Sequence, residues 1–152
     1  MTADALAAHP FTKPFWPDHL ARLSHMASEV HFAPGELIFH EGDRSSLFYL
    51  LISGSVAIEV QSPGRTVRVD TLYGGEVLGW SSVTAENSKH FQARALEPVD
   101  AIALDGARLR RACSEDYAFG FEFLSALTDV MSSRLRALRT QLLDAYTPVR
   151  AQ

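Results

Sequence analysis

The pattern of apolar and polar positions divides the 152-residue chain into three zones with no linker between them. In the first zone, residues 17–28, apolar side chains recur at helical spacing behind Asp18, which can cap a helix near Pro17. The apolar side chains on this spacing are Leu20, Leu23 and Met26. This zone therefore predicts a short amphipathic helix.

The second zone, about residues 30–104, consists of short apolar runs separated by turn residues. The turns recur roughly every eight to twelve positions, a spacing typical of short antiparallel strands in a barrel or jelly roll. Between two of these runs, Pro63 and Gly64 supply the bend of a hairpin. We therefore expect a mainly β fold with flanking helices, built on an antiparallel β-roll of the jelly-roll (double-stranded β-helix) class.

The third zone is helical and begins after Asp105, which can cap a short helix over about residues 106–113. Ser114 can cap a longer helix over about residues 115–146, and a proline soon afterwards ends it. The first turn of this longer helix carries negative charge, which the helix dipole favours. The acidic residues in that turn are Glu115 and Asp116.

Apolar side chains recur every seven residues along the long helix, and further ones follow two of the repeats by four residues. A seven-residue apolar stripe suits a helix that pairs with a copy of itself. The stripe consists of Leu124, Met131, Leu135, Leu138, Leu142 and Ala145. It predicts a homodimer through the C-terminal helix. The alternative is that the stripe packs on the β-roll of its own chain.

The chain carries 14 basic and 18 acidic residues, which gives a formal net charge of −4. A nucleic-acid-binding domain usually has a basic surplus, so this balance argues against DNA binding. One basic cluster falls on the long helix, where we interpret it as the solvated face. Its members are Arg134, Arg136 and Arg139.

The length fits a single domain, residues 1–152. No apolar run approaches the ~18 residues that span a membrane, and the N-terminal segment lacks the features of a signal peptide. A single cysteine, Cys113, excludes an internal disulfide and any metal site held by several cysteines. We therefore expect a cytoplasmic domain without membrane contact.

The six histidines lack the closely spaced pair that a metal-dependent jelly-roll enzyme needs, so no metal site is predicted. No serine lies in a nucleophile elbow, and Cys113 has no histidine near it in the sequence. A haem sensor with one histidine ligand stays open, although the sequence singles out no histidine for it. We expect no catalytic residues and no enzyme activity, and rank a jelly-roll enzyme lowest.

A pattern of glycines and apolar runs points to a known family. The stretch "FAPGELIFHEGDRSSLFYLLISGSVAIEV" resembles the opening of cyclic nucleotide-binding domains, as in the bacterial cyclic AMP receptor protein (Crp/Fnr-like) family. The matching positions are Phe32, Gly35, Ile38, Glu41, Gly42, Asp43, the run 48–52, Gly54 and Val56. The resemblance extends over roughly residues 10–146 and implies the β-roll, its closing helices and a helix at a dimer interface.

The segment "GEVLGWSSVTAENSKHFQARALE" stands where this family has its phosphate-binding cassette. In the family, a glutamate holds the ribose hydroxyl and an arginine neutralises the cyclic phosphate. By that resemblance, Trp80 stands at the glutamate's position, and Lys89 or His90 stands at the arginine's position. The candidate ligand-binding residues are Gly75, Glu76, Gly79, Trp80, Ser81, Ser82, Lys89 and His90.

These departures change the expected ligand. Trp80 offers one N–H donor and no acceptor, so it cannot receive a hydroxyl proton as a carboxylate does. Lys89 carries a charge but lacks the two-pronged guanidinium of arginine. Ser81 and Ser82 fall at the start of a short helix, where free N–H groups and hydroxyls can accept an anion. The sequence therefore predicts an atypical ligand, a cyclic nucleotide other than cyclic AMP or another small anion.

Two alternatives remain at this point. In one, Trp80 with His90 and Phe91 fills the pocket, and the protein is a ligand-free dimeric interaction protein. In the other, the domain binds cyclic AMP in the ordinary way. Transcriptional relatives carry a DNA-binding helix-turn-helix after the long helix, whereas this sequence stops at Gln152. We therefore expect no direct DNA binding, and a regulatory role through a small ligand and the dimer helix.

Overall fold

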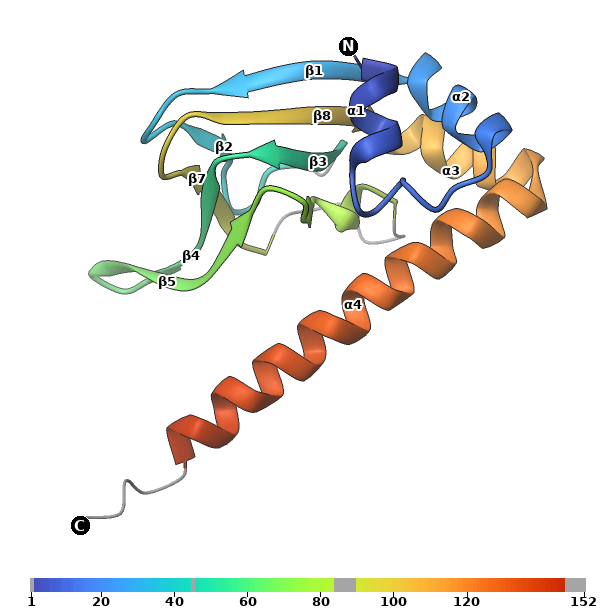
Figure 1. Ribbon diagram of the computed structural model, residues 1–152. Coiled ribbons are helices and arrows are strands. Elements are labelled where there is room, and N and C mark those ends of the chain that lie inside the picture. Colours follow the sequence, from blue (N-terminus) through green and yellow to red (C-terminus); the bar gives the residue numbers. More distant parts are fainter. Residues whose placement is uncertain (1, 45, 84–89, 147–152) are drawn as a thin grey trace.

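A computed structural model describes residues 2–44, 46–83 and 90–146 (Figure 1). Their strands form two four-stranded antiparallel sheets, in the orders β1-β8-β3-β6 and β2-β7-β4-β5. The strands of the first sheet are β1 (Ala27–Phe32), β8 (Val99–Asp105), β3 (Leu47–Ser53) and β6 (Val77–Leu78). Those of the second are β2 (Leu37–Phe39), β7 (Gln92–Ala95), β4 (Ser55–Ser62) and β5 (Arg65–Tyr73). The predicted antiparallel β-roll is confirmed.

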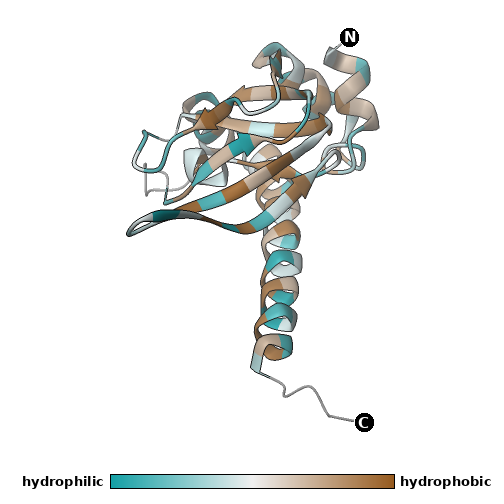
Figure 2. Ribbon diagram, turned by 90° about the vertical axis from the view of Figure 1, so that its left-hand side faces the viewer, coloured by the Kyte–Doolittle hydropathy of each residue, from teal (hydrophilic) through white to brown (hydrophobic). Residues whose placement is uncertain are grey.

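The helices are α1 (Thr2–Ala8), α2 (Pro17–His25), α3 (Gly106–Glu115) and α4 (Tyr117–Tyr146), with a short 3-10 helix, η1 (Trp80–Val83). Helices α1, α2 and α3 gather at one end of the sheets, and the C-terminal end of α4 projects beyond them (Figures 1 and 2). None of the helices in the described ranges is both long enough and apolar enough to cross a membrane. The sequence predicted α2, α3 and α4 but not α1, whose Leu6 is fully buried.

Two apolar clusters form the core. One lies between the two sheets and is built from strand side chains such as Val56, Ala93 and Ala101. The other joins the first sheet to the helices, with Phe48 and Leu50 of β3 packed against Phe119 and Phe123 of α4. Because both sides of the first sheet are covered, β3 carries four consecutive buried residues instead of the alternation of a half-exposed strand. The second cluster fixes the start of α4 on the β-roll.

The boundary between α3 and α4 differs from the predicted one, in a stretch where several successive polar residues could cap a helix. Asp105 caps α3 as predicted, because its Oδ1 accepts from the N–H groups of Ala107 and Arg108. The prediction that Ser114 caps the long helix is wrong, since its Oγ donates to a carbonyl within α3. Asp116 takes that role and accepts from two N–H groups of the first turn of α4. Glu115 therefore ends α3 and does not belong to the first turn of α4.

The start of α2 also differs in detail. Trp16 stands at the N-cap and makes no side-chain hydrogen bond there, so the prediction that Asp18 caps this helix is wrong. Pro17 occupies the first turn, where its missing N–H costs nothing. The helix ends at His25 rather than at residue 28, because β1 already begins at Ala27 and pairs with β8.

A buried histidine anchors the segment between α1 and α2. The Nε2 atom of His9 lies 3.0 Å from the carbonyl oxygen of Leu51, and its Nδ1 accepts from the N–H of Phe11 at 3.1 Å. The ring is therefore neutral, with its proton on Nε2. Burial lowers the pKa of His9, although hydrogen bonds to backbone carbonyls act in the opposite direction. This arrangement holds the N-terminal segment against the end of β3.

Most of the apolar stripe of α4 is exposed rather than packed on the β-roll. Its members are from 38% to 67% exposed: Leu124, Met131, Leu135, Leu138 and Leu142. Apolar positions recur along the whole length of α4 in Figure 2. The buried residues of α4 are a different set, Phe119, Gly120, Phe123 and Leu127. The alternative in which the stripe packs on its own β-roll is therefore wrong. Leu138 also lines a cavity between α4 and the β-roll.

Candidate ligand-binding site

The turn between β5 and η1 is shaped by two glycines. Gly75 and Gly79 have φ angles of +95° and +86°, a region that side chains with a Cβ rarely adopt. Between them, Glu76 closes the turn, because its Oε2 accepts from the N–H of Tyr73 at 2.7 Å. The short strand β6 follows and pairs with β3. The backbone path that the sequence predicted for this turn is thus formed by glycine conformation and one carboxylate.

Helix η1 is held closely against α3. Both the N–H and the Oγ of Ser82 donate to the carbonyl oxygen of Gly79, at 3.1 and 2.8 Å. A Cβ on Gly106 would lie 2.4 Å from the carbonyl oxygen of Ser82, so only glycine allows this approach. The prediction that Ser82 offers free donors to an anion is therefore wrong, because the residue is buried and its donors are used within the turn.

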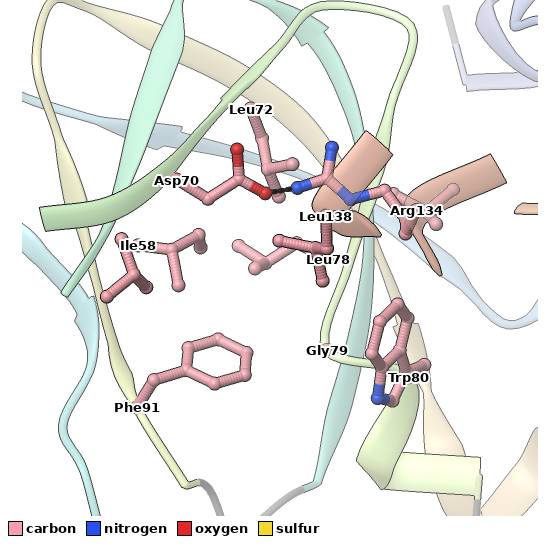
Figure 3. Close-up of a pocket in the computed structure, with 11 residues that line it drawn as sticks. Ile58, Asp70, Leu72, Leu78, Gly79, Trp80, Phe91, Arg134 and Leu138 are labelled. Atoms are coloured by element: carbon pink, nitrogen blue, oxygen red, sulfur yellow. Dashed lines mark ion pairs between the residues drawn. The ribbon is translucent and has the colours of Figure 1, made fainter. Parts of the chain in front are cut away.

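Beside this turn lies a cavity of about 200 Å³ between the β-roll and α4 (Figure 3). Its walls come from β4, β5, β6, the start of η1, Phe91 and two residues of α4. The lining residues are Ile58, Val69, Asp70, Leu72, Val77, Leu78, Gly79, Trp80, Phe91, Arg134 and Leu138. Most of these side chains are apolar, so the cavity suits a ligand with a substantial apolar part.

One ion pair crosses the cavity from the β-roll to α4. The guanidinium of Arg134 pairs with the carboxylate of Asp70, and its Nη1 lies 3.1 Å from Oε1 of Glu76. These side chains are only 22%, 19% and 35% exposed, in the order Arg134, Asp70 and Glu76. Burial lowers the pKa of Arg134, yet arginine remains charged at any physiological pH. One cation thus faces two carboxylates.

Local sequence explains why Asp70 points into the cavity. The register between β4 and β5 shifts at Ile58 and Glu59, so that Asp70 pairs with Ile58 while Arg68 pairs with Glu59. This irregularity leaves Val69 as an extra residue in β5, and such bulges re-aim neighbouring side chains. Sequence periodicity did not identify Asp70, because a bulge interrupts the period of two. The interpretation of Arg134 as part of a solvated face is wrong.

The predicted site residues divide into four groups. Gly79 and Trp80 line the cavity, and Leu138 of the predicted dimer stripe joins them. Gly75 and Glu76 line a neighbouring hollow beside Pro10 instead. Ser81, Ser82 and His90 are described but do not line the cavity, while Lys89 lies outside the described residues.

Of the three aromatic side chains that the sequence placed at the pocket, Trp80 and Phe91 line the cavity and His90 does not. Phe91 lines the cavity and packs against Phe39, with ring centroids 5.6 Å apart. Trp80 packs partly against the helix-side core and forms a side of the cavity without filling it (Figure 3). Within the described ranges, no three histidine, cysteine or acidic side chains gather as a metal site would require.

Comparisons with known proteins agree on the fold. A family model for the cyclic nucleotide-binding domain matches residues 29–116. The chain is 26% identical over 129 residues to a CRP-like cAMP-activated global transcriptional regulator of Mycobacterium tuberculosis. That match covers 84% of this chain but only 56% of the length of the relative.

Two solved structures show the same fold. A cyclic nucleotide-binding domain from Methylobacillus flagellatus superimposes with a TM-score of 0.84 at 15% identity, covering 98% of this chain and 86% of the other. The regulatory subunit of a cAMP-independent protein kinase A from Trypanosoma brucei gives a TM-score of 0.68 at 19% identity. That likeness covers 91% of this chain and 49% of the other.

Proposed function

The chain belongs to the cyclic nucleotide-binding domain family, and on this premise we propose that it senses a small, mainly apolar ligand in the cavity between the β-roll and α4. Fold alone does not settle function, so the proposal rests on the site. The observation that carries it is that strands and α4 contribute to one cavity, joined by the pair of Asp70 and Arg134. The protein would act as a regulatory module rather than as an enzyme.

The charges of the cavity bear on the class of ligand. Among the described lining residues the cation is Arg134, and it already faces Asp70 and Glu76. An anion that binds Arg134 here competes with these two carboxylates and lies close to their negative charge, which costs free energy. A neutral ligand avoids this cost. The described residues that line the cavity therefore favour a neutral, largely apolar molecule over the anion that the sequence predicted.

Ordinary cyclic AMP binding is disfavoured by Trp80. A ribose hydroxyl needs an acceptor at this position, and an indole provides only a donor. The Mycobacterium tuberculosis relative is cAMP-activated by its description, whereas the Trypanosoma brucei regulatory subunit is described as cAMP-independent. The family fold therefore accommodates both behaviours, and the side chains of this cavity favour the second.

The output of the module would be a change in the position of α4. Arg134 and Leu138 belong to α4 and line the cavity directly, so a ligand contacts both the β-roll and this helix. A ligand that binds one arrangement of α4 more tightly shifts the population toward it. The exposed stripe of α4 would transmit this change to a second copy, since an apolar stripe of this length suits helix pairing.

The ligand-free alternative, in which Trp80 closes the pocket, is less well supported. Trp80 lies at the side of a cavity of about 200 Å³ and does not fill it. An apolar cavity near this size can hold a small aromatic molecule.

Thermal unfolding with two matched probes tests the proposal: benzyl alcohol and benzoate carry the same ring but differ in charge. Cyclic AMP and cyclic GMP are added as further ligands in the same thermal unfolding assay.

We expect benzyl alcohol to raise the melting temperature more than benzoate at equal concentration, and cyclic AMP to leave it unchanged. The variant Val69→Phe should abolish the effect, because Val69 lines the cavity and is 46% exposed, so that the strand tolerates a larger side chain. Val67→Phe is the matched control on the same strand, outside the cavity lining. Stabilisation by cyclic AMP above that by benzyl alcohol, or an equal response in Val69→Phe, would refute the proposal.

A further inference from the structure

A second, positively charged hollow lies between α2 and α3, away from the cavity described above. It measures about 260 Å³ and is lined by Arg22, His25, Met26, Arg108, Arg111, Ala112 and Glu115. Three guanidinium groups and one imidazole thus share this hollow with one carboxylate. This local surplus of positive charge contrasts with the formal net charge of −4 for the whole chain.

Two of the three arginines are already held in place. Arg22 pairs with Glu115 at 3.3 Å and with Asp116 at 3.5 Å, and its guanidinium lies 5.5 Å from the centre of the Phe119 ring. The Nη2 atom of Arg108 donates to the carbonyl oxygen of His25 at 3.3 Å. Since a carbonyl accepts without neutralising the charge, Arg108 keeps its full positive charge toward the hollow.

Arg111 lies one turn after Arg108 on the same face of α3. No carboxylate lies within ion-pair distance of its guanidinium among the residues that the structure describes. Glu115 follows on this face, but it is engaged with Arg22. Among the described residues, the hollow therefore presents two arginines without a carboxylate partner, beside a third that is fixed in position.

We propose that this hollow is a binding site for a phosphate-bearing anion of the diphosphate class. Guanidinium groups bind phosphate oxygens through two parallel hydrogen bonds, and such charge-assisted bonds are about twice as strong as neutral ones. A diphosphate can engage Arg108 and Arg111 at once, with an imidazole N–H of His25 of α2 as a further donor. This site is independent of the ligand cavity, because the two share no lining residue.

Calorimetric titration with inorganic pyrophosphate tests the proposal on the full chain. We expect saturable binding of one pyrophosphate per chain, and a shift of the ¹H–¹⁵N signals of α2 and α3 at the same concentrations. Arg111→Gln should weaken binding by about tenfold, the loss of one charge-assisted bond at a partly exposed site. Because Arg111 is exposed and pairs with no carboxylate in the part of the chain that the structure describes, this variant should fold normally.

Arg110→Gln is the matched control, since Arg110 is the adjacent exposed residue of α3 and does not line the hollow. It removes the same charge and should change the affinity by less than about twofold. Glu115→Gln should tighten binding, because it removes the carboxylate from the lining. Equal weakening by Arg110→Gln and Arg111→Gln would overturn the site, as would the absence of saturable binding. Tighter binding of a hexaglutamate peptide than of pyrophosphate would overturn it in favour of an acidic protein partner.

Discussion

The ion pair between Asp70 and Arg134 joins β5 to α4, so its strength decides how firmly the helix is held on the β-roll. Replacing Asp70 by asparagine keeps the side-chain shape and removes the charge. Replacing Arg134 by methionine keeps an extended side chain and removes the cation. The two single variants and the double variant form a cycle that isolates the energy of the pair.

The magnitude follows from the burial of the two groups. Exposed ion pairs contribute about 0–1 kcal/mol, whereas breaking a fully buried pair costs about 3–5 kcal/mol. Asp70 and Arg134 are 19% and 22% exposed, and Glu76 remains near Arg134 after Asp70 is changed. We therefore expect a coupling free energy of about 1–2 kcal/mol and a fall in the melting temperature of about 3–6 °C for Asp70→Asn.

Urea unfolding at one fixed protein concentration measures the cycle, because dimerisation would otherwise add to the apparent stability. The control is the pair of Arg22 and Glu115, which lies at 3.3 Å but is 33% and 58% exposed. Its coupling should stay below about 0.5 kcal/mol. A coupling for Asp70 and Arg134 no larger than that of the control would refute the view that this pair fixes α4.

Three further predictions concern stability and assembly. Because burial lowers the pKa of His9, the unfolded chain binds more protons than the folded one as pH falls through the unfolded value of about 6.5 toward the lower pKa of the folded state. Stability should therefore fall as pH drops from 7.5 to 5.5, and His9→Gln should flatten that slope in urea titrations. Gly54→Ala should destabilise by at least about 3 kcal/mol, because φ is +91° and a backbone oxygen lies 2.4 Å from the new Cβ. Gly64→Ala, with φ +80° and open space, should cost only about 1 kcal/mol by the same measurement. Leu135→Glu should convert a dimer to a monomer in light-scattering chromatography, whereas Thr140→Glu on another face of α4 should leave the mass unchanged.

Much of the fold could be predicted from local sequence signals. The hairpin at Gly64, the cap at Asp105 and the strand-rich middle of the chain each follow from short-range chemistry. The sequence favours Ser114 as the cap of the long helix, because Ser114, Glu115 and Asp116 stand in succession. Only the packing of α3 against α4 selects Asp116. Helix α1 gave too short an apolar pattern to predict, since its burial depends on the core around Leu6.

The candidate site was predictable only in its backbone. Gly79 and Trp80 line the cavity, and their role in ligand binding stays a prediction. The pairing of Asp70 with Arg134 could not be predicted, because the two residues are 64 positions apart in the sequence. They meet only through a bulge in β5 and the path of α4. The prediction for Ser82 is wrong because its N–H and its hydroxyl both donate to the carbonyl oxygen of Gly79 within the turn. The spacing of residues in the sequence does not show these hydrogen bonds. Contacts between distant elements thus decided the chemistry of the cavity.

In the proposed sensing role, one ligand contacts the β-roll and α4 together. Methyl NMR during titration with benzyl alcohol follows both contacts at once, because Ile58 of β4 and Leu138 of α4 both carry methyl groups in the cavity wall. Both signals should shift and saturate at the same concentration, and neither should shift in Val69→Phe. Saturable binding that leaves either signal of the wild-type protein unchanged would contradict this role.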